Sequence, residues 1–114
     1  MKPIKFVGTS LHALKDFPVD ARRDAGFQLH FIQVGQKPPD WKPMKTVGSG
    51  AIEIRIHRNG EWRVVCVAKF ESAVYVLHAF KKETQSTRAE DIALARARYR
   101  EIENYEKSKR RVGK

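Results

Sequence analysis

Basic and imidazole side chains recur between Ala51 and Lys82, where apolar and polar residues alternate as they do in β-strands. An arginine can hold a phosphate through two N–H groups, and a lysine can bind it as a point charge. A histidine, with an ordinary pKa of about 6.5, can transfer a proton near neutral pH. Neighbouring strands would bring these groups onto one support, which predicts a surface for a phosphate-bearing partner. The groups are Arg55, His57, Arg63, Lys69, His78, Lys81 and Lys82.

The overall charge indicates the same class of partner. The chain has 114 residues, with 23 Lys and Arg against 13 Asp and Glu, and a formal net charge of +10. Its pI is about 10.1. Such a surplus predicts a polyanionic partner, either nucleic acid or an acidic protein. The length fits a single domain over residues 1–114.

Several classes of site and location are excluded. Cys66 is the one cysteine, so no disulfide or thiolate zinc site forms within the chain, and a reducing cytoplasm is expected. The sequence has no carboxylate cluster or His–Cys spacing of the kind that binds a metal, and we expect no metal and no cofactor. It also has no run of about 18 apolar residues, so we expect no membrane span. The basic N-terminus lacks the apolar segment of a signal peptide.

Three strands must position the basic groups. β-branched and aromatic residues dominate three runs separated by turn residues, at 51–57, 62–70 and 73–80. Asn59-Gly60 accepts positive φ at low cost and predicts a tight hairpin between the first two strands. In the first strand, isoleucines alternate with Glu53, Arg55 and His57, which predicts one core face and one polar face. The second strand is expected at the centre of the sheet, covered on both faces.

The third strand and the flanking elements complete an α+β fold. Strict alternation in the third strand places His78 on the face of Val74 and Val76. Apolar spacing predicts two helices on one face of the sheet and a third after a capping box at residues 87–90. The remaining predictions are an edge strand at 3–7, helices at 11–17, 18–34 and 88–106, and a basic, flexible tail at 107–114.

Residues 36–50 contain three prolines and two glycines and are predicted to form a loop. Lys42 and Lys45 flank Trp41 and Met44 there, an arrangement that suits stacking and charge contacts with single-stranded nucleic acid. The alternative interpretation is that Trp41 and Met44 fix the loop to the core. The sequence leaves both interpretations open.

Residues 62–102, WRVVCVAKFESAVYVLHAFKKETQSTRAEDIALARARYREI, resemble the HigB-type, phage-derived-protein-like branch of the RelE/ParE toxin superfamily. The resemblance lies in the order of a Trp-Arg-Val strand, a strand ending in Leu-His-Ala-Phe-Lys-Lys, and a helix with Ile-xx-Ala-xx-Arg. It implies a curved antiparallel sheet with two N-terminal helices on one face and a C-terminal helix. Two departures are Glu83, where the family often has Thr, and Arg88, where it often has Pro.

The resemblance implies the toxin of a type II toxin–antitoxin pair, usually an endoribonuclease that cuts mRNA on the ribosome. Metal-independent cleavage by the ribose 2′-hydroxyl needs a proton-transfer group and cations on the phosphate. Arg63, His78 and Lys82 are the predicted catalytic side chains. The predicted RNA-binding side chains are Arg55, His57, Lys69, Lys81, Lys42, Lys45 and Trp41. Arg63 alternatively pairs with Glu53 or Glu61, and His78 is alternatively a core histidine.

The expected partners are mRNA on the ribosome and an antitoxin, acidic or of the helix-turn-helix type. Two alternative functions remain on the same fold. One is a non-enzymatic ParE-like toxin that inhibits DNA gyrase. The other is an inactive phage-derived protein that binds nucleic acid, for which the negative charge of Glu83 beside Lys81-Lys82 gives some support.

Overall fold

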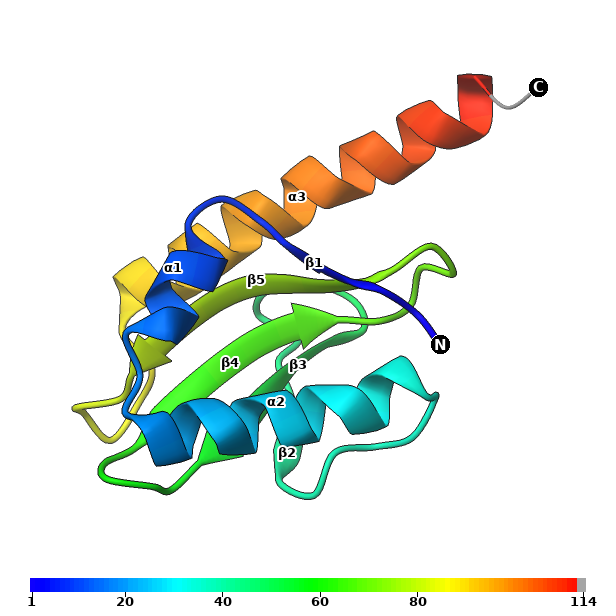
Figure 1. The fold of residues 1–114 in the computed structure, drawn as a ribbon. Coiled ribbons are helices and arrows are strands. Elements are labelled where there is room, and N and C mark those ends of the chain that lie inside the picture. The colour runs from blue at the N-terminus through cyan, green and yellow to red at the C-terminus, as the bar shows by residue number, and fades with distance from the viewer. Residues whose placement is uncertain (113–114) are drawn as a thin grey trace.

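The computed structural model describes residues 1–112 and shows a five-stranded sheet between two helical layers (Figure 1). The elements are β1 (Ile4–Phe6), α1 (Ser10–Lys15), α2 (Val19–Gln33), β2 (Trp41–Pro43), β3 (Ala51–Ile56), β4 (Trp62–Val67), β5 (Val74–Lys81) and α3 (Ala89–Val112). The strand order is β1-β5-β4-β3-β2. Helices α1 and α2 pack on one face and α3 packs on the other, so the predicted α+β class is confirmed.

The sheet is mixed, and the prediction of an antiparallel sheet is wrong for one strand. The predicted edge strand at 3–7 exists as β1, but it runs parallel to β5, with Ile4 opposite Val74. The pairing continues toward α1, because Val7 N and Ser10 Oγ both donate to the Val76 carbonyl, over 2.9 and 3.0 Å. The direction of β1 is set by its pairing with β5, which is distant in sequence. The short sequence of β1 carries no information about that pairing.

The hairpin between β3 and β4 forms where the sequence predicts it. Asn59 and Gly60 have φ angles of +54° and +122°, and Ile56 pairs with Trp62 across the turn. Strand β4 is the central strand, as predicted. Its alternate side chains enter two separate cores.

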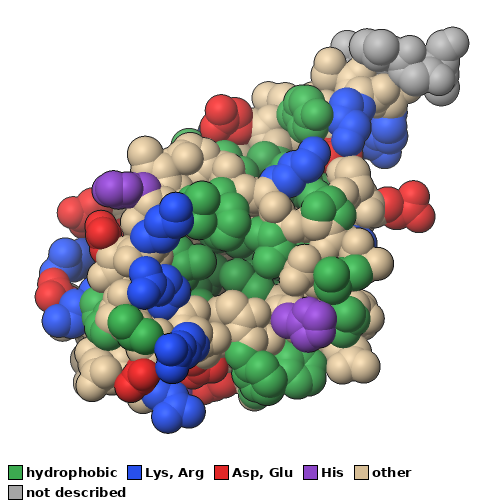
Figure 2. Space-filling view, viewed as in Figure 1, with side chains coloured by type: hydrophobic (Ala, Val, Ile, Leu, Met, Phe, Trp, Pro, Cys, Tyr) green, Lys and Arg blue, Asp and Glu red, His purple; other side chains and the backbone are tan. Residues whose placement is uncertain are grey.

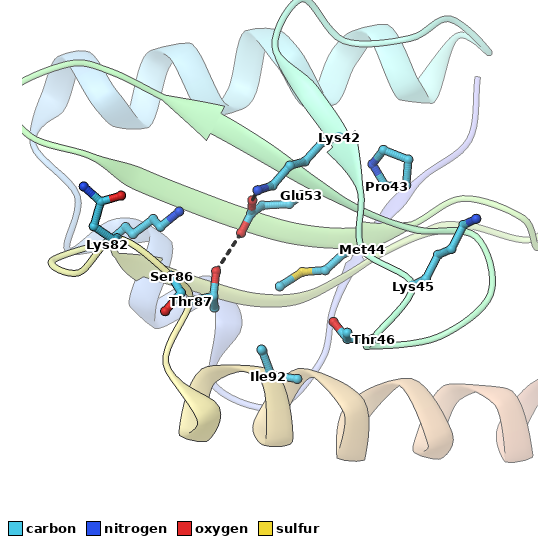
Figure 3. Close-up of a pocket in the computed structure, with 11 residues that line it drawn as sticks. Lys42, Pro43, Met44, Lys45, Thr46, Glu53, Lys82, Ser86, Thr87 and Ile92 are labelled. Carbon is cyan, nitrogen blue, oxygen red and sulfur yellow. Dashed lines mark hydrogen bonds and ion pairs between the residues drawn. The ribbon is translucent and has the colours of Figure 1, made fainter.

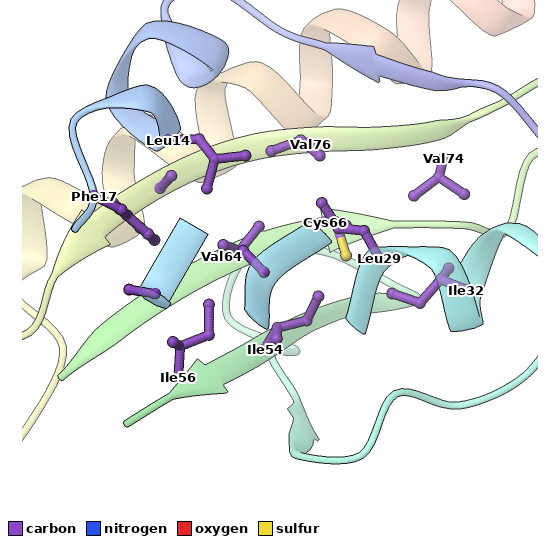
Figure 4. Packing of buried hydrophobic residues seen from close by; sticks show 13 residues of the cluster. Leu14, Phe17, Leu29, Ile32, Ile54, Ile56, Val64, Cys66, Val74 and Val76 are labelled. Carbon is purple, nitrogen blue, oxygen red and sulfur yellow. The ribbon is translucent and has the colours of Figure 1, made fainter. Parts of the chain in front are cut away.

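The first core lies between the sheet and helices α1 and α2 (Figure 4). It includes Leu29 of α2, Ile54 of β3 and Val64 of β4, all almost fully buried. The second core lies between the opposite face and α3, and includes Val65, Leu77 and Tyr99. Both faces of the central strands are therefore occupied, and polar groups on the α3 face must fit among apolar neighbours.

The alternation along β5 breaks at a β-bulge. Val65 of β4 pairs with His78, whereas the next residue, Cys66, pairs with Val76, so Leu77 is the extra residue. Arg98 of α3 is buried and donates to the Leu77 carbonyl over 2.8 Å, which satisfies a backbone group at the bulge. Because of the extra residue, His78 faces α3. The prediction that it shares a face with Val74 and Val76 is wrong.

Strand β2 lies inside the stretch predicted as loop. Trp41 and Pro43 pair with Ile54 and Ile52 of β3 in antiparallel register. A proline cannot donate to a sheet ladder, but it is tolerated at an edge. The prolines that predicted a loop are thus compatible with a short edge strand.

Helix α3 begins one residue later than predicted and extends beyond the predicted end at residue 106. Lys109 lies 3.5 Å from the Glu106 carboxylate and over the Tyr105 ring, contacts between successive turns that support the extension. The predicted basic tail, 107–114, is therefore helical as far as Val112, and residues 113–114 lie outside the described residues. No helix within residues 1–112 is long and apolar enough to cross a membrane.

Candidate nucleic-acid interface

Two rows of paired residues cross the α3 face of the sheet. One row consists of Lys42, Glu53, Val65 and His78. The next row consists of Arg55, Arg63 and Phe80. Directly opposed residues in antiparallel strands project to the same face. The strand register therefore brings together predicted site residues from four strands, and the bulge at Leu77 is what adds His78 to them.

An open cleft of about 670 Å³ lies on this face, between β2, β3 and the start of α3 (Figure 3). Lys42, Lys45 and Lys82 line it, together with Glu53 and Thr87. In the described part of the chain, no ion pair involves Lys45 or Lys82, whereas Lys42 Nζ lies 3.5 Å from Glu53 Oε1. The cleft therefore offers ammonium groups to solvent that no carboxylate neutralises directly.

Helix α3 fixes the loop that carries Lys45. Arg96 donates to the Thr46 carbonyl through Nε (2.9 Å) and Nη2 (2.7 Å), and the Tyr99 hydroxyl donates to the Ser49 carbonyl over 2.6 Å. A Cβ at Gly48 would lie only 2.5 Å from the Tyr99 ring, so this position needs glycine. The wall of the cleft is thus tied to the second core.

Glu53 lies at the base of the cleft and has no exposed side-chain surface. Besides Lys42, it contacts the Thr87 hydroxyl, which donates to Oε2 over 3.3 Å, and Arg63, whose Nε lies 3.9 Å from Oε1. Thr87 was predicted to cap α3, and its hydroxyl is directed at Glu53. Neither Glu53 Oε1 nor Arg63 Nε has a hydrogen-bond partner among the described residues, although both atoms are buried.

Arg63 is buried and paired, with only 7% of its side chain exposed. Its Nη1 donates to Glu61 Oε1 over 3.1 Å and to the Trp62 carbonyl over 2.9 Å. The structure thus contains both of the ion pairs that the sequence offered as the alternative to a phosphate contact. In this conformation a phosphate cannot reach the Nε edge of Arg63 without displacing Glu53.

The outer ends of β3 and β4 carry a set of alternating charges, which we call the hairpin network: Asp40, Arg55, His57, Glu61 and Arg63. Arg55 donates to Asp40 over 2.8 Å, and the two ring nitrogens of His57 lie 2.7 Å from Asp40 and 2.8 Å from Glu61. Cations and carboxylates alternate along this chain of contacts. Arg55 and His57, predicted to bind RNA, are therefore paired with acidic neighbours.

The hairpin network shifts the pKa values of its members. Hydrogen bonds to Glu61 and then Asp40 raise the pKa of His57. The hydrogen bond from His57 lowers the pKa of Glu61. For Asp40, burial acts to raise the pKa, but hydrogen bonds from His57 and Arg55 outweigh it and the pKa is lowered. All three shifts favour a charged imidazole between two carboxylates.

His78 is buried beside α3. Its Nε2 donates to Asp91 Oδ1 over 2.7 Å, its ring stacks on Phe80, and its Nδ1 is buried without a partner among the described residues. The residue does not line the cleft. One ring nitrogen is hydrogen-bonded, as in a core histidine. The other has no partner among the described residues, as a proton-transfer group requires.

The other predicted contacts lie apart from the cleft. Lys81 pairs with Trp62 and lies over its ring, on the first-core face, so the expected convergence of Lys81 with Arg63 is wrong. Lys69 donates to the Tyr99 hydroxyl over 2.6 Å. Trp41 is partly exposed beneath Lys37 and belongs to neither core, whereas Met44 is buried in the second core.

The α1–α2 side of the molecule differs from the cleft. Figure 2 shows Lys and Arg side chains beside Asp and Glu side chains around the beginning of α2. Arg58 lies 3.8 Å from Asp24, and a second hollow there is lined by Asp20, Arg23 and Phe27. This side therefore presents mixed charge.

Residues 12–100 match the family model described as "Phage derived protein Gp49-like". The matched segment covers most of the 114 residues and includes every residue that lines the cleft. The chain belongs to this family. The Gp49-like family is a RelE/ParE-like toxin family, so the broader resemblance found in the sequence is confirmed, and the narrower HigB-type placement stays a prediction. A comparison with curated proteins found no match.

The sequence of this Gp49-like chain identifies the cations of the site and offers Glu53 and Glu61 as partners of Arg63, but it does not identify Asp40, Asp91 or Thr87 as site residues. A further signal for Glu53 is its alternation with isoleucines in a strand flanked by basic residues. Asp40 and Asp91 reach the site from elements distant in sequence. Within residues 1–112 no group of three or more His, Cys, Asp or Glu side chains is arranged to hold a metal ion.

Proposed function

We propose that this Gp49-like chain is the toxin of a type II toxin–antitoxin pair and that it cuts mRNA on the ribosome without a metal ion. The family supports the toxin role. The main support for binding to mRNA is the open cleft, which is lined by Lys42, Lys45 and Lys82. A groove of this charge suits a single-stranded backbone.

In this proposal the three lysines hold phosphates of the strand, and Lys82 is the one among them that is predicted to be catalytic. Arg63 would stabilise charge on the scissile phosphate, because a guanidinium can donate two parallel hydrogen bonds to it. His78, oriented by Asp91, is the candidate for proton transfer to or from the ribose and the leaving oxygen. Arg63 and His78 are buried in the free protein, so both roles require side-chain movement when RNA binds.

The partners follow from the same proposal. A toxin needs a neutralising antitoxin, and a protein with a net charge of +10 is matched by an acidic segment or domain. The substrate is mRNA presented by the ribosome, and the site of action is the cytoplasm.

Cleavage on translating ribosomes tests the proposal. Incubation of the protein with ribosomes and a defined mRNA should produce cuts at reproducible positions, mapped by primer extension. Lys82→Ala should reduce the cutting rate about 100-fold or more, the scale for losing one transition-state contact. Lys15→Ala, which removes the same charge from an exposed position on α1, is the control. Intact mRNA in the presence of ribosomes and wild-type protein would refute the nuclease.

A non-enzymatic, ParE-like toxin that inhibits DNA gyrase is the second candidate. The observation that favours it is the closed state of Arg63, which is ion-paired with both Glu53 and Glu61. Inhibition of supercoiling by purified gyrase, with mRNA left intact, would select this function. The third alternative, an inactive nucleic-acid-binding protein, would bind RNA and give neither result.

A further inference from the structure

The Glu53 carboxylate occupies the position that a phosphate would need in order to contact Arg63. It lies between two cations and a hydroxyl: Lys42 Nζ at 3.5 Å, Arg63 Nε at 3.9 Å and Thr87 Oγ1 at 3.3 Å. Carboxylate and phosphate oxygens accept hydrogen bonds from the same kinds of donor. The three groups therefore form an anion site that is already filled by a side chain of the protein.

The contact between Glu53 and Arg63 is incompletely satisfied. Glu53 is completely buried, yet its Oε1 has no hydrogen-bond partner among residues 1–112, and neither has the facing Nε of Arg63. A buried polar atom without a partner costs free energy, and removing charged groups from water is repaid only by good geometry. An anion with more acceptor oxygens, such as a phosphodiester, can satisfy these donors better.

The cleft gives an incoming strand access to this site. Lys42 and Thr87 line the cleft and also cover Glu53, so the same two residues face the solvent side and the carboxylate (Figure 3). Lys45 and Lys82 lie on the same cleft without a carboxylate partner in the described residues. A strand that binds these lysines first would bring its next phosphate over Glu53.

We propose that Glu53 is an intramolecular competitor of RNA: it holds Lys42 and Arg63 in the free protein and withdraws when a phosphate of the bound strand takes its place. The proposal rests on the proposed function for the identity of the ligand. It has a consequence for selectivity. Displacement of Glu53 opposes binding, so a single phosphate binds poorly, and only a strand that also contacts Lys45 and Lys82 overcomes the competition.

The test compares two substitutions that each remove one negative charge. Glu53→Gln removes the competing carboxylate with little change of shape. Asp16→Asn removes a carboxylate from an exposed site on the other side of the sheet and serves as the control. Affinity for a labelled single-stranded 2′-O-methyl oligoribonucleotide, which cannot be cleaved through its 2′-oxygen, is measured by fluorescence anisotropy over a range of salt. We expect Glu53→Gln to bind severalfold more tightly than Asp16→Asn. The slope of log affinity against log salt should be equal in the two variants, because the same phosphate contacts Lys42 and Arg63 in either bound state.

A second measurement covers the case in which Glu53→Gln does not fold. In wild-type protein labelled with ¹⁵N-arginine, the Nε resonance of Arg63 should shift when the oligonucleotide is added. It should not shift when inorganic phosphate is added at the same concentration.

The outcomes separate this proposal from the proposed function. Equal affinities for Glu53→Gln and Asp16→Asn, or an Arg63 resonance that the oligonucleotide does not move, would overturn the competitor role even if mRNA is cut. Tighter binding by Glu53→Gln together with intact mRNA on ribosomes would support the competitor and refute the nuclease.

Discussion

The cleft and the hairpin network contain similar side chains but differ in how their charges are compensated. In the cleft, Lys45 and Lys82 have no carboxylate partner in the described residues, and Lys42 shares the single carboxylate of Glu53. In the hairpin network, Asp40 and Glu61 bind all three cationic members. A phosphate must compete with a carboxylate in the network but not at Lys45 or Lys82. The number of basic residues thus predicts a polyanionic partner, whereas the acidic neighbours determine which basic residues can bind it.

The wall of the cleft depends on a glycine that packs against α3. Gly48→Ala should lower the free energy of unfolding by about 1–3 kcal/mol, the range for overpacking, because its Cβ would lie 2.5 Å from the buried Tyr99 ring. Displacement of the loop should also weaken RNA binding through Lys45. Urea unfolding and fluorescence anisotropy check the two effects. Unchanged stability would show that the loop is not fixed by α3.

The second prediction separates the cleft from other basic surface. Lys42→Ala with Lys82→Ala should weaken oligoribonucleotide binding about tenfold or more and reduce the salt slope by about 1.4, the value for two phosphate contacts on a single strand. Lys5→Ala with Lys15→Ala removes the same charge from exposed positions on β1 and α1. Equal losses in the two double variants would mean that binding depends on net charge and that the cleft is not special.

The third prediction is a glycine control with the opposite sign. Gly26 lies inside α2 and a Cβ there would meet no atom within 4 Å. Gly26→Ala should therefore raise the free energy of unfolding by about 0.5–1 kcal/mol, since glycine is a poor residue for a helix interior. RNA affinity should stay at the wild-type value. A destabilised Gly26→Ala would remove the contrast with Gly48.

The smallest expected effect tests the hairpin network through pH. Because the pKa of His57 is raised, its stabilising contribution is complete below about 6.5, its ordinary value, and is lost as the pH rises through the raised value. Asp40 and Glu61 have lowered pKa values, so their contributions are present above their ordinary values of 3.8 and 4.5 and are lost on acidification. The network is thus most stabilising between these limits.

His57→Gln isolates this contribution. The difference in unfolding free energy between wild type and His57→Gln should be greatest near pH 5.5 and shrink as the pH rises, and it should stay below about 1 kcal/mol because His57 is half exposed. Urea titrations at several pH values measure it. A difference that grows toward alkaline pH would show that His57 is not held as a cation.

Much of the fold was predictable because its signals are local. Asn59-Gly60 fixes the hairpin, and the hydrophobic spacing of residues 19–33 and of 89–102 predicts the two long helices. The predictions of the fold are wrong where the local structure involves residues that are distant in sequence. At the bulge, Arg98 of α3 donates a hydrogen bond to the Leu77 carbonyl, and the edge strand β2 pairs with β3. Period-two alternation carries no sign of an inserted residue, so it places His78 on the wrong face of the sheet.

The candidate site was predictable in part. The sequence named the cleft lysines and also Arg63, and strand register explains why several of them share a face. Their pairing was not predictable in full: Glu61 and Glu53 were possible partners for Arg63, and the structure uses both. Asp40 reaches His57 from the segment before β2, and Asp91 reaches His78 from α3.

Three properties follow from the amino-acid sequence without a structure: an α+β chain with a large positive charge, a central three-stranded meander and a match to a RelE/ParE-like toxin family. Composition and periodicity are sufficient for these properties, because they depend on charge counts and on neighbours within a few residues. The burial of Glu53 between Lys42 and Arg63 is visible only in the folded chain, as is the lack of an ion-pair partner for Lys45 and Lys82 among the described residues. Electrostatic interactions act over a few ångströms in space, and only folding sets which charges lie that close.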